Sequence, residues 1–197
     1  KEITLAIENE YIMSPQDLCT LPFLDKVLDA GVKILKIEGR GRSPEYTKVT
    51  VGVYSEAVKA IQNGEFTEEK IAQWTERLRS VYNRDFWDGY YLGRKMGEWT
   101  QRYGSQATKT KIFVGTVTNF FAKINVAEIR METQDLKVGD DIMIIGPTTG
   151  VYEDKVSEIR VDLKPVESTE KGELCSIPVK DVIRRGDKVY KVIDAES

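Results

Sequence analysis

The chain has 197 residues, of which 31% are charged and 41% hydrophobic, as expected for a soluble globular protein of one or two domains. Its formal net charge of -3 gives no overall attraction to nucleic acid or anionic lipid, and no apolar run approaches the roughly 20 residues that a membrane span needs. Histidine is absent, which excludes a Ser-His-Asp or Cys-His nucleophile pair and a His-ligated zinc within this chain.

The chain begins at Lys1, without a methionine and without the apolar core of a signal peptide. We therefore expect a fragment of a longer, cytoplasmic protein. Residues 1–104 have the pattern of an α/β domain, mostly helical, and residues 109–197 have the pattern of an all-β domain. The small, polar residues 104–108 between them are the expected linker.

The first part opens with a loosely alternating segment, residues 1–7, which predicts a strand. Ser14 as N-cap and Pro15 at the first helical position predict a helix, which Gly31 ends. Residues 32–37 predict a short, buried strand. Because this strand leads back to a helix, the pattern is that of a βα unit in a parallel sheet.

Two further helices are predicted. Ser43 and Pro44 start the first, which residues 63–64 end, and Thr67 opens the second. Residues 77–103 then combine aromatic side chains with a local excess of basic ones. This combination suits single-stranded RNA, or alternatively an apolar lid that packs on another domain.

The second part contains short β-branched runs separated by glycine-containing turns, which predict about six strands. The runs are residues 112–118, 122–130, 141–145, 151–161, 173–179 and 187–193. We interpret them as a small closed barrel, which leaves no exposed sheet edge. The whole chain is thus predicted to be α+β: an α/β remnant of a (β/α) barrel, followed by a roughly six-stranded antiparallel β-barrel.

The end of the predicted strand at 32–37 is the candidate site, because substrates bind at this junction in barrels of parallel strands. Arg40 and Arg42 follow the strand and meet a helix N-terminus capped by Ser43. Guanidinium and backbone N–H groups together predict an anion site suited to a dicarboxylate or a phosphate. Glu38 is the acid–base candidate, and the alternative is that it only forms a structural ion pair with Arg40 or Lys36.

Tyr46 lies on the first turn of the same helix, so we take it, with Glu38, as a candidate catalytic residue. Lys36 is a candidate substrate-binding residue, or else it points into the barrel interior, where it needs a carboxylate partner. Cys19 is predicted one turn into a helix, where the helix dipole lowers the thiol pKa and favours a metal-binding thiolate. The alternative is a buried small apolar residue, which is also the reading for Cys175.

Residues 12–63 resemble the C-terminal part of peptidase family U32, the collagenase-like peptidases. The similarity rests on Met13-Ser14-Pro15-Gln16-Asp17-Leu18-Cys19, Ala30-Gly31-Val32, Leu35-Lys36-Ile37-Glu38-Gly39-Arg40, Ser43-Pro44-Glu45-Tyr46 and Tyr54. Further along, Asn83-Arg84-Asp85-Phe86 resembles a later turn of the family, with Asp85 where the family has glycine. Residues 112–193 resemble the second-domain barrel of elongation factor Tu, which part of this family carries at its C-terminus.

The resemblance implies a modified (β/α) barrel that lies mostly before Lys1. It also implies, for several members, anaerobic or prephenate-dependent hydroxylation of tRNA wobble uridine, of ribosomal RNA or of the ubiquinone ring; a prephenate-like carboxylate is the donor expected for tRNA. Such members carry an iron–sulfur cluster on four cysteines. Cys19 matches one of those ligands. Its partners would be in the intact parent, so we expect no cofactor in this fragment and no activity from it alone.

Three functions stay open from the sequence. The first is a C-terminal part of a tRNA-hydroxylating family member, with the β-barrel as an accessory domain that binds substrate or a partner. The second is a genuine collagenase-like protease acting on protein, and the third is a non-catalytic module that binds RNA or protein; none involves a membrane. Residues 109–197 hold 14 Lys and Arg against 16 Asp and Glu, so only a one-sided basic patch could support RNA binding there.

Overall fold

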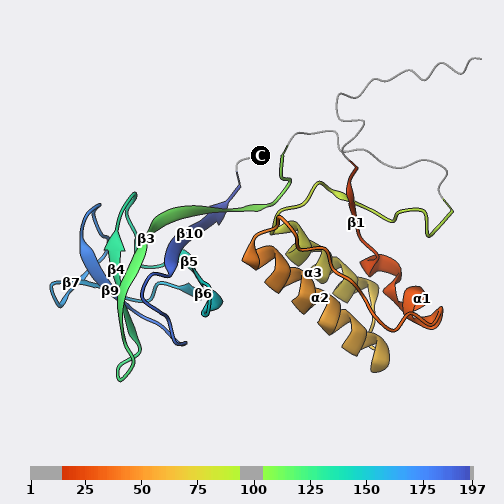
Figure 1. Ribbon diagram of the computed structural model, residues 1–197, viewed down its shortest axis with the longest axis horizontal. Helices are drawn as coiled ribbons and strands as arrows, with labels where there is room; N and C mark the ends of the chain where they lie inside the picture. The colour runs from red at the N-terminus through yellow and green to blue at the C-terminus, as the bar shows by residue number, and fades with distance from the viewer. Residues whose placement is uncertain (1–14, 94–103, 196–197) are drawn as a thin grey trace, which may run out of the picture. The chain divides into compact units, whose positions relative to one another are not determined.

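The computed structural model describes residues 15–93 and 104–195. The chain divides into two compact units, Lys1–Thr108 and Lys109–Ser197. The first unit is mainly helical and the second is a β-sheet unit (Figure 1). No helix among the described residues is long and apolar enough to cross a membrane.

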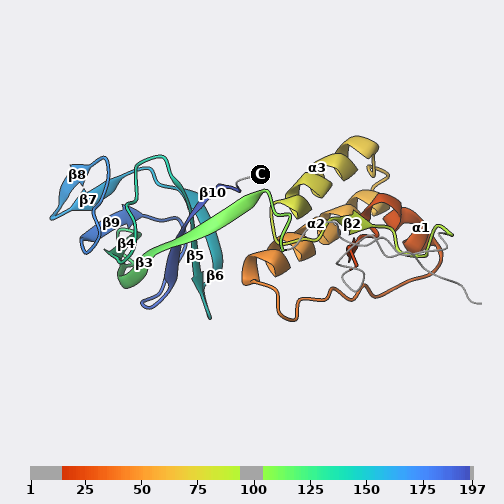
Figure 2. The same cartoon turned by 90° about the horizontal axis from the view of Figure 1, so that it is seen from above.

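Two helices, α2 (Pro44–Gln62) and α3 (Glu68–Arg79), lie side by side and are the longest elements described in the first unit (Figures 1 and 2). Both were predicted, and their starts are confirmed. Ser43 is the extended N-cap residue before Pro44, and the Thr67 hydroxyl accepts a hydrogen bond from the Lys70 N–H.

The core of this unit forms where the apolar faces of the helices meet a short preceding segment, the 3₁₀ turn η1 (Leu21–Phe23) and α1 (Leu24–Asp29). Leu21 and Leu24 are fully buried there. From α2 and α3 the buried core side chains are Val53, Ala57, Ala60, Trp74 and Leu78.

The predicted helix from Ser14 to Gly31 is wrong over its first half, and Ser14 itself lies outside the described residues. Residues Asp17–Leu18 form a short strand, β1, which pairs in parallel with β2 (Phe86–Trp87). The backbone N–H of Asp17 donates to the Asp85 carbonyl. Pairing with a segment almost 70 residues away therefore overrides the local capping signal, and the α-helix begins only at Leu24.

The predicted buried strand at residues 32–37 is also wrong. These residues have no regular secondary structure, and the Ile34 side chain is 84% exposed. A strand needs a hydrogen-bonded neighbour, and none of the described residues pairs with this segment. The parallel sheet of the first unit is consequently reduced to β1 and β2, while the predicted strand at 1–7 lies outside the described residues.

Over residues 109–195 the second unit has eight strands, joined in one antiparallel sheet in the order β6-β5-β10-β3-β4-β9-β7-β8. The strands are β3 (Lys109–Phe121), β4 (Val126–Met131), β5 (Asp141–Gly146), β6 (Gly150–Lys155), β7 (Ile159–Val161), β8 (Lys164–Val166), β9 (Leu174–Pro178) and β10 (Lys188–Asp194). The six predicted runs fall on these strands. The run at 151–161 is divided between β6 and β7, and β8 was missed.

The sheet is not closed, so the predicted closed barrel is wrong. No hydrogen-bonded ladder joins the two end strands, β6 and β8, within the described residues, and they lie at opposite ends of the unit (Figure 2). Strand β8 has only three residues, and Pro165 at its centre has no N–H to donate. A short strand with a central proline is suited to a sheet edge.

The inward face of this sheet forms one apolar core. Val114, Ile129, Ile144 and Val189 are fully buried at its centre. Gly115 of β3 pairs with Met131 of the antiparallel strand β4, and its lack of a side chain allows the two backbones to approach closely. A Cβ atom at this position would lie 2.2 Å from the carbonyl oxygen of Arg130.

We predict that Gly115→Ala destabilises the second unit by about 1–3 kcal/mol, because the added methyl group overlaps backbone that cannot move without breaking the β3–β4 ladder. Gly52→Ala is the matched control. Gly52 lies within α2, where a Cβ atom meets nothing nearer than 3.8 Å, so alanine should raise the stability of the first unit by about 0.5–1 kcal/mol. Calorimetric unfolding of both variants checks the opposite signs, and equal, small shifts would contradict the expected overlap.

Candidate functional site

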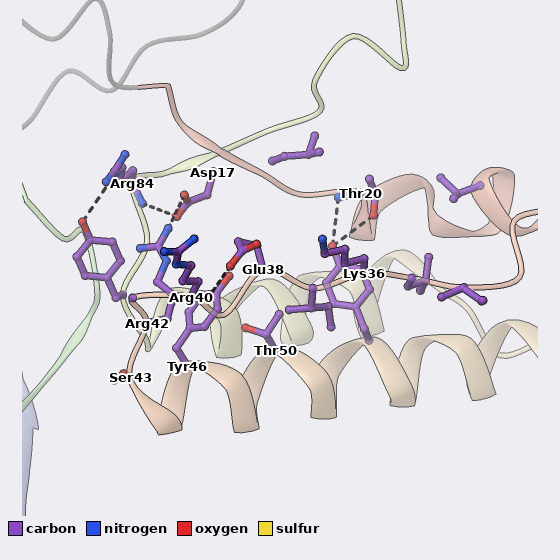
Figure 3. Close-up of a pocket in the computed structure, with 18 of the residues that line it drawn as sticks. Asp17, Thr20, Lys36, Glu38, Arg40, Arg42, Ser43, Tyr46, Thr50 and Arg84 are labelled. Carbon is purple, nitrogen blue, oxygen red and sulfur yellow. Dashed lines mark hydrogen bonds and ion pairs between the residues drawn. The ribbon is translucent and has the colours of Figure 1, made fainter.

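A cavity of about 880 Å³ lies in the first unit, between β1, the segment 32–43 and the N-terminal half of α2 (Figure 3). It contains every predicted catalytic and substrate-binding residue. Those six residues are Lys36, Glu38, Arg40, Arg42, Ser43 and Tyr46. The structure thus brings them together without a strand at 32–37, although their roles stay predictions.

The Arg42 guanidinium contacts one carboxylate and two aromatic rings, and Figure 3 shows Arg42 between Asp17 and Tyr46. Its Nη2 atom lies 2.8 Å from the Asp17 carboxylate, and its guanidinium lies 4.3 Å from the ring centre of Tyr82 and 5.2 Å from that of Tyr46. The Asp17 carboxylate also accepts a hydrogen bond from the backbone N–H of Arg84. Because Asp17 already neutralises its charge, Arg42 is better suited to holding the site together than to binding a ligand.

Glu38 and Arg40 form a local turn. The Glu38 carboxylate accepts a hydrogen bond of 2.7 Å from the backbone N–H of Arg40. The alternative reading, an ion pair between Glu38 and the side chain of Arg40 or Lys36, is not formed among the described residues. The side chains of Arg40 and Lys36 are exposed at the cavity, so a bound anion can reach them.

Tyr46 and Ser43 occupy the start of α2. Burial raises the pKa of the Tyr46 hydroxyl, and the Arg42 guanidinium partly opposes this rise. Tyr46 therefore stays protonated at neutral pH and can donate a hydrogen bond. The Ser43 side chain makes no capping hydrogen bond to the helix, which leaves its hydroxyl available at the cavity wall.

Cys19 does not lie in a helix, so the predicted effect of a helix dipole on its thiol is wrong. It follows β1, is 6% exposed, and has its Sγ atom 3.9 Å from the Tyr54 hydroxyl oxygen. Burial raises the pKa of this thiol, opposite to the predicted direction. It also raises the pKa of Tyr54 to about 12, assisted by the charge of the neighbouring thiolate.

Cys19 lines a separate cavity of about 40 Å³, which adjoins the main one through shared residues such as Asp17 and Tyr54. Cys175, as predicted, is fully buried in the core of the second unit. Across residues 15–93 and 104–195, no group of three or more His, Cys, Asp or Glu side chains could hold a metal ion. The described residues therefore do not by themselves form the ligand set of a four-cysteine cluster.

The sequence reasoning missed the residues that close the cavity from β1 and from the turn after α3. Asp17 and Tyr54 were noted only as parts of the family motifs. Tyr82 and Arg84 were assigned to a basic, aromatic stretch that forms an RNA surface or a lid. In the structure Tyr82 stacks on Arg42 and lines the cavity; residues 94–103 of that stretch lie outside the described residues.

The model of one protein family, peptidase family U32, matches residues 1–101, which include every residue of this cavity. The chain belongs to this family.

Among its relatives, this U32 protein is 52% identical over 189 residues to a protein named collagenase from Porphyromonas gingivalis, a match that covers 96% of this chain and 46% of that protein. It is 31% identical over 140 residues to tRNA hydroxylation protein P1 of Bacillus subtilis, covering 70% of this chain and 32% of that protein. The chain spans about half the length of the collagenases that it matches.

Among solved structures, the U32 protein matches the C-terminal domain of a Geobacillus thermoleovorans protein assigned to the U32 peptidases. The TM-score is 0.39 at 15% identity, and the match covers 40% of this chain and 90% of the other.

We predict that Asp17→Asn destabilises the first unit by about 1–3 kcal/mol, because it leaves the half-buried guanidinium of Arg42 without a counter-charge. All three tryptophans of the chain precede residue 109, so thermal unfolding followed by tryptophan fluorescence reports on this unit alone. Glu65→Gln is the control, since it removes only an exposed pair with Lys70 and should change the melting temperature little. Equal effects of the two substitutions would show that the Asp17–Arg42 pair has no special role.

A second prediction concerns Cys19. Because burial raises the pKa of its thiol, the group is protonated at pH 8 and should react slowly with iodoacetamide in the folded chain. Mass spectrometry of the alkylated peptides, compared between native and urea-unfolded protein, measures the protection. Rapid, stoichiometric alkylation of Cys19 in the native chain would contradict it.

Proposed function

We propose that this chain is the C-terminal part of an enzyme that hydroxylates the wobble uridine of tRNA, and that the cavity of the first unit binds the small carboxylate that serves as donor. The observation that carries the proposal is the two exposed cations, Lys36 and Arg40, at a cavity where Asp17 already neutralises Arg42 and the Arg84 side chain donates to the Tyr82 hydroxyl. Sequence similarity to tRNA hydroxylation proteins of Bacillus subtilis, Haemophilus influenzae and Escherichia coli supports the choice of reaction.

The charges of the cavity favour an anionic ligand. Arg42 and Asp17 cancel each other, and Glu38 is directed to the backbone of Arg40. Lys36 and Arg40 can each pair with one carboxylate group of a bound ligand. Charge-assisted hydrogen bonds of this kind are stronger than neutral ones. The hydroxyl groups of Tyr46 and Ser43 provide uncharged donors beside them.

The size of the cavity also fits a small molecule, since about 880 Å³ lies within the usual range for ligand sites. In this proposal Glu38 acts as the acid–base group and Tyr46 as a hydrogen-bond donor. An iron–sulfur cluster belongs to the proposal only for the intact parent, where Cys19 would be one of four ligands. No step assigned to the present residues depends on it.

A second candidate function, a collagenase-like protease, is favoured by the 52% identity with the Porphyromonas gingivalis collagenase. In this alternative Glu38 would activate water for peptide hydrolysis, with other groups supplied by the rest of the protein. The cation pair of the cavity has no evident role in cleaving a neutral peptide bond, so we place this function second.

Binding of the donor is tested with the present chain. We predict that prephenate binds in an isothermal titration, and that Arg40→Gln weakens binding about tenfold, the loss expected for one charge-assisted hydrogen bond. Arg79→Gln is the matched control, because Arg79 is an exposed arginine of α3 that pairs with Glu76 away from the cavity. Absence of binding by the unmodified chain, or an equal loss in both variants, would refute the carboxylate site.

The reaction is tested with the full-length protein, in cells whose own gene for it is deleted. Glu38→Gln is predicted to abolish hydroxylated wobble uridine, detected by mass spectrometry of tRNA nucleosides, while protein level and folding are retained. Cleavage of gelatin by the same purified protein is measured in parallel. Gelatin cleavage that Glu38→Gln abolishes, with tRNA unchanged, would favour the protease instead.

A further inference from the structure

Strands β3 and β10 run side by side in the second unit (Figure 1). Their outer face carries a patch of aromatic and basic side chains. We call it the β3–β10 patch, and it consists of Lys111, Phe113, Arg130, Lys188 and Tyr190. The rings of Phe113 and Tyr190 meet edge to face, with centres 5.8 Å apart. Each ring carries an ammonium group: Lys111 lies 5.0 Å from the Tyr190 centre, and Lys188 lies 5.5 Å from the Phe113 centre.

The strand register explains why these side chains share one face. Tyr190 is paired with Phe113, and Lys188 is paired with Thr116, whose hydroxyl accepts a hydrogen bond of 2.8 Å from the Lys188 ammonium. Arg130 is paired with the same Thr116 from the opposite side, on β4. Side chains alternate along a strand, so the intervening residues, such as Val114 and Val189, face the core and are fully buried.

The patch is locally basic although the unit as a whole is slightly acidic. Among the described residues, neither the Lys188 ammonium nor the Arg130 guanidinium enters an ion pair. Glu128 shares the outer face of β4 with Arg130, and its carboxylate accepts a hydrogen bond of 2.6 Å from the Thr118 hydroxyl. The acidic groups at the nearby strand ends are paired with other lysines. Asp141 pairs with Lys155 at 3.3 Å, Asp140 with Lys191 at 2.7 Å, and Asp194 with Lys109 at 2.5 Å.

We propose that the β3–β10 patch binds single-stranded RNA. Aromatic rings on which bases stack, next to cations that contact phosphates, are the combination that sequence-independent single-strand binding requires. Bases would stack on Tyr190 and Phe113, and backbone phosphates would contact Lys188 and Arg130. The choice of RNA over DNA rests on the proposed function in tRNA modification, whereas the stacking surface and its charge come from the sheet itself.

RNA binding by the whole chain is measured by fluorescence anisotropy with a labelled twelve-nucleotide oligouridylate at low salt. Tyr190→Ala is expected to weaken binding about tenfold, the loss of one stacked base. Lys188→Gln should lower the slope of log affinity against log salt by about 0.7, because one phosphate contact is removed. Lys164→Gln is the control, since this exposed lysine lies on the far edge strand β8 and should leave both values unchanged.

Folding is checked separately, with Tyr190→Leu as a second variant that keeps an apolar side chain at the ladder position. If it melts like the unmodified chain and still loses stacking, the loss is due to the ring. Unchanged RNA binding by folded Tyr190 and Lys188 variants would overturn the proposal, as would absence of binding at low salt. Equal binding of oligothymidylate of the same length would overturn the choice of RNA.

The proposed carboxylate site and the proposed RNA site can be refuted independently of each other. Arg40→Gln should weaken prephenate binding and leave oligouridylate binding unchanged, whereas Tyr190→Ala should do the reverse. RNA binding that depends on Arg40 instead of Tyr190 would place the nucleic acid at the cavity and overturn the assignment to the β3–β10 patch. Loss of carboxylate binding alone would refute the proposed donor site without affecting the patch.

Discussion

Three segments that are distant in sequence meet at the guanidinium of Arg42, and the geometry of the cavity depends on that meeting. Asp17 lies in β1, Tyr46 lies on the first turn of α2, and Tyr82 lies in the turn after α3. All three contact Arg42. A planar cation can pair with a carboxylate at its edge while rings cover its faces, which an ammonium group cannot do equally well. The ion pair therefore ties the irregular segment 32–43, which contains Arg42, to β1.

The cations of the cavity therefore differ in role: one is used in an internal ion pair, and others are exposed to a ligand. Arg42 is only 18% exposed and already paired, while Lys36 and Arg40 are exposed along the cavity. An anion gains most from cations that have no partner to give up, since breaking a buried pair costs more than an exposed contact returns. The two arginines, alike in the sequence and two residues apart, thus have different capacities for binding.

The second unit shows how the distribution of charge can matter more than its sum. Its lysines and arginines are outnumbered by its acids, yet several acids pair with lysines at the strand ends. Lys188 and Arg130 are left beside an aromatic pair at the centre of the outer face. The alternation of side chains along β3 and β10 produces this sidedness, because each residue is committed to one face by the register of the ladder.

The sequence alone determined the helices α2 and α3, through their caps and apolar faces, and most strands of the second unit, through alternation and glycine turns. It also placed the candidate residues near Glu38 and Arg40, because a Ser-Pro helix start directly follows two arginines. These features arise from neighbours in the chain. Only the tertiary structure decided that residues 17–18 pair as a strand, that residues 32–37 remain irregular, that Cys19 is buried beside Tyr54, and that the sheet stays open. Each of these depends on whether a partner distant in sequence is present, and local propensity carries no information about such a partner.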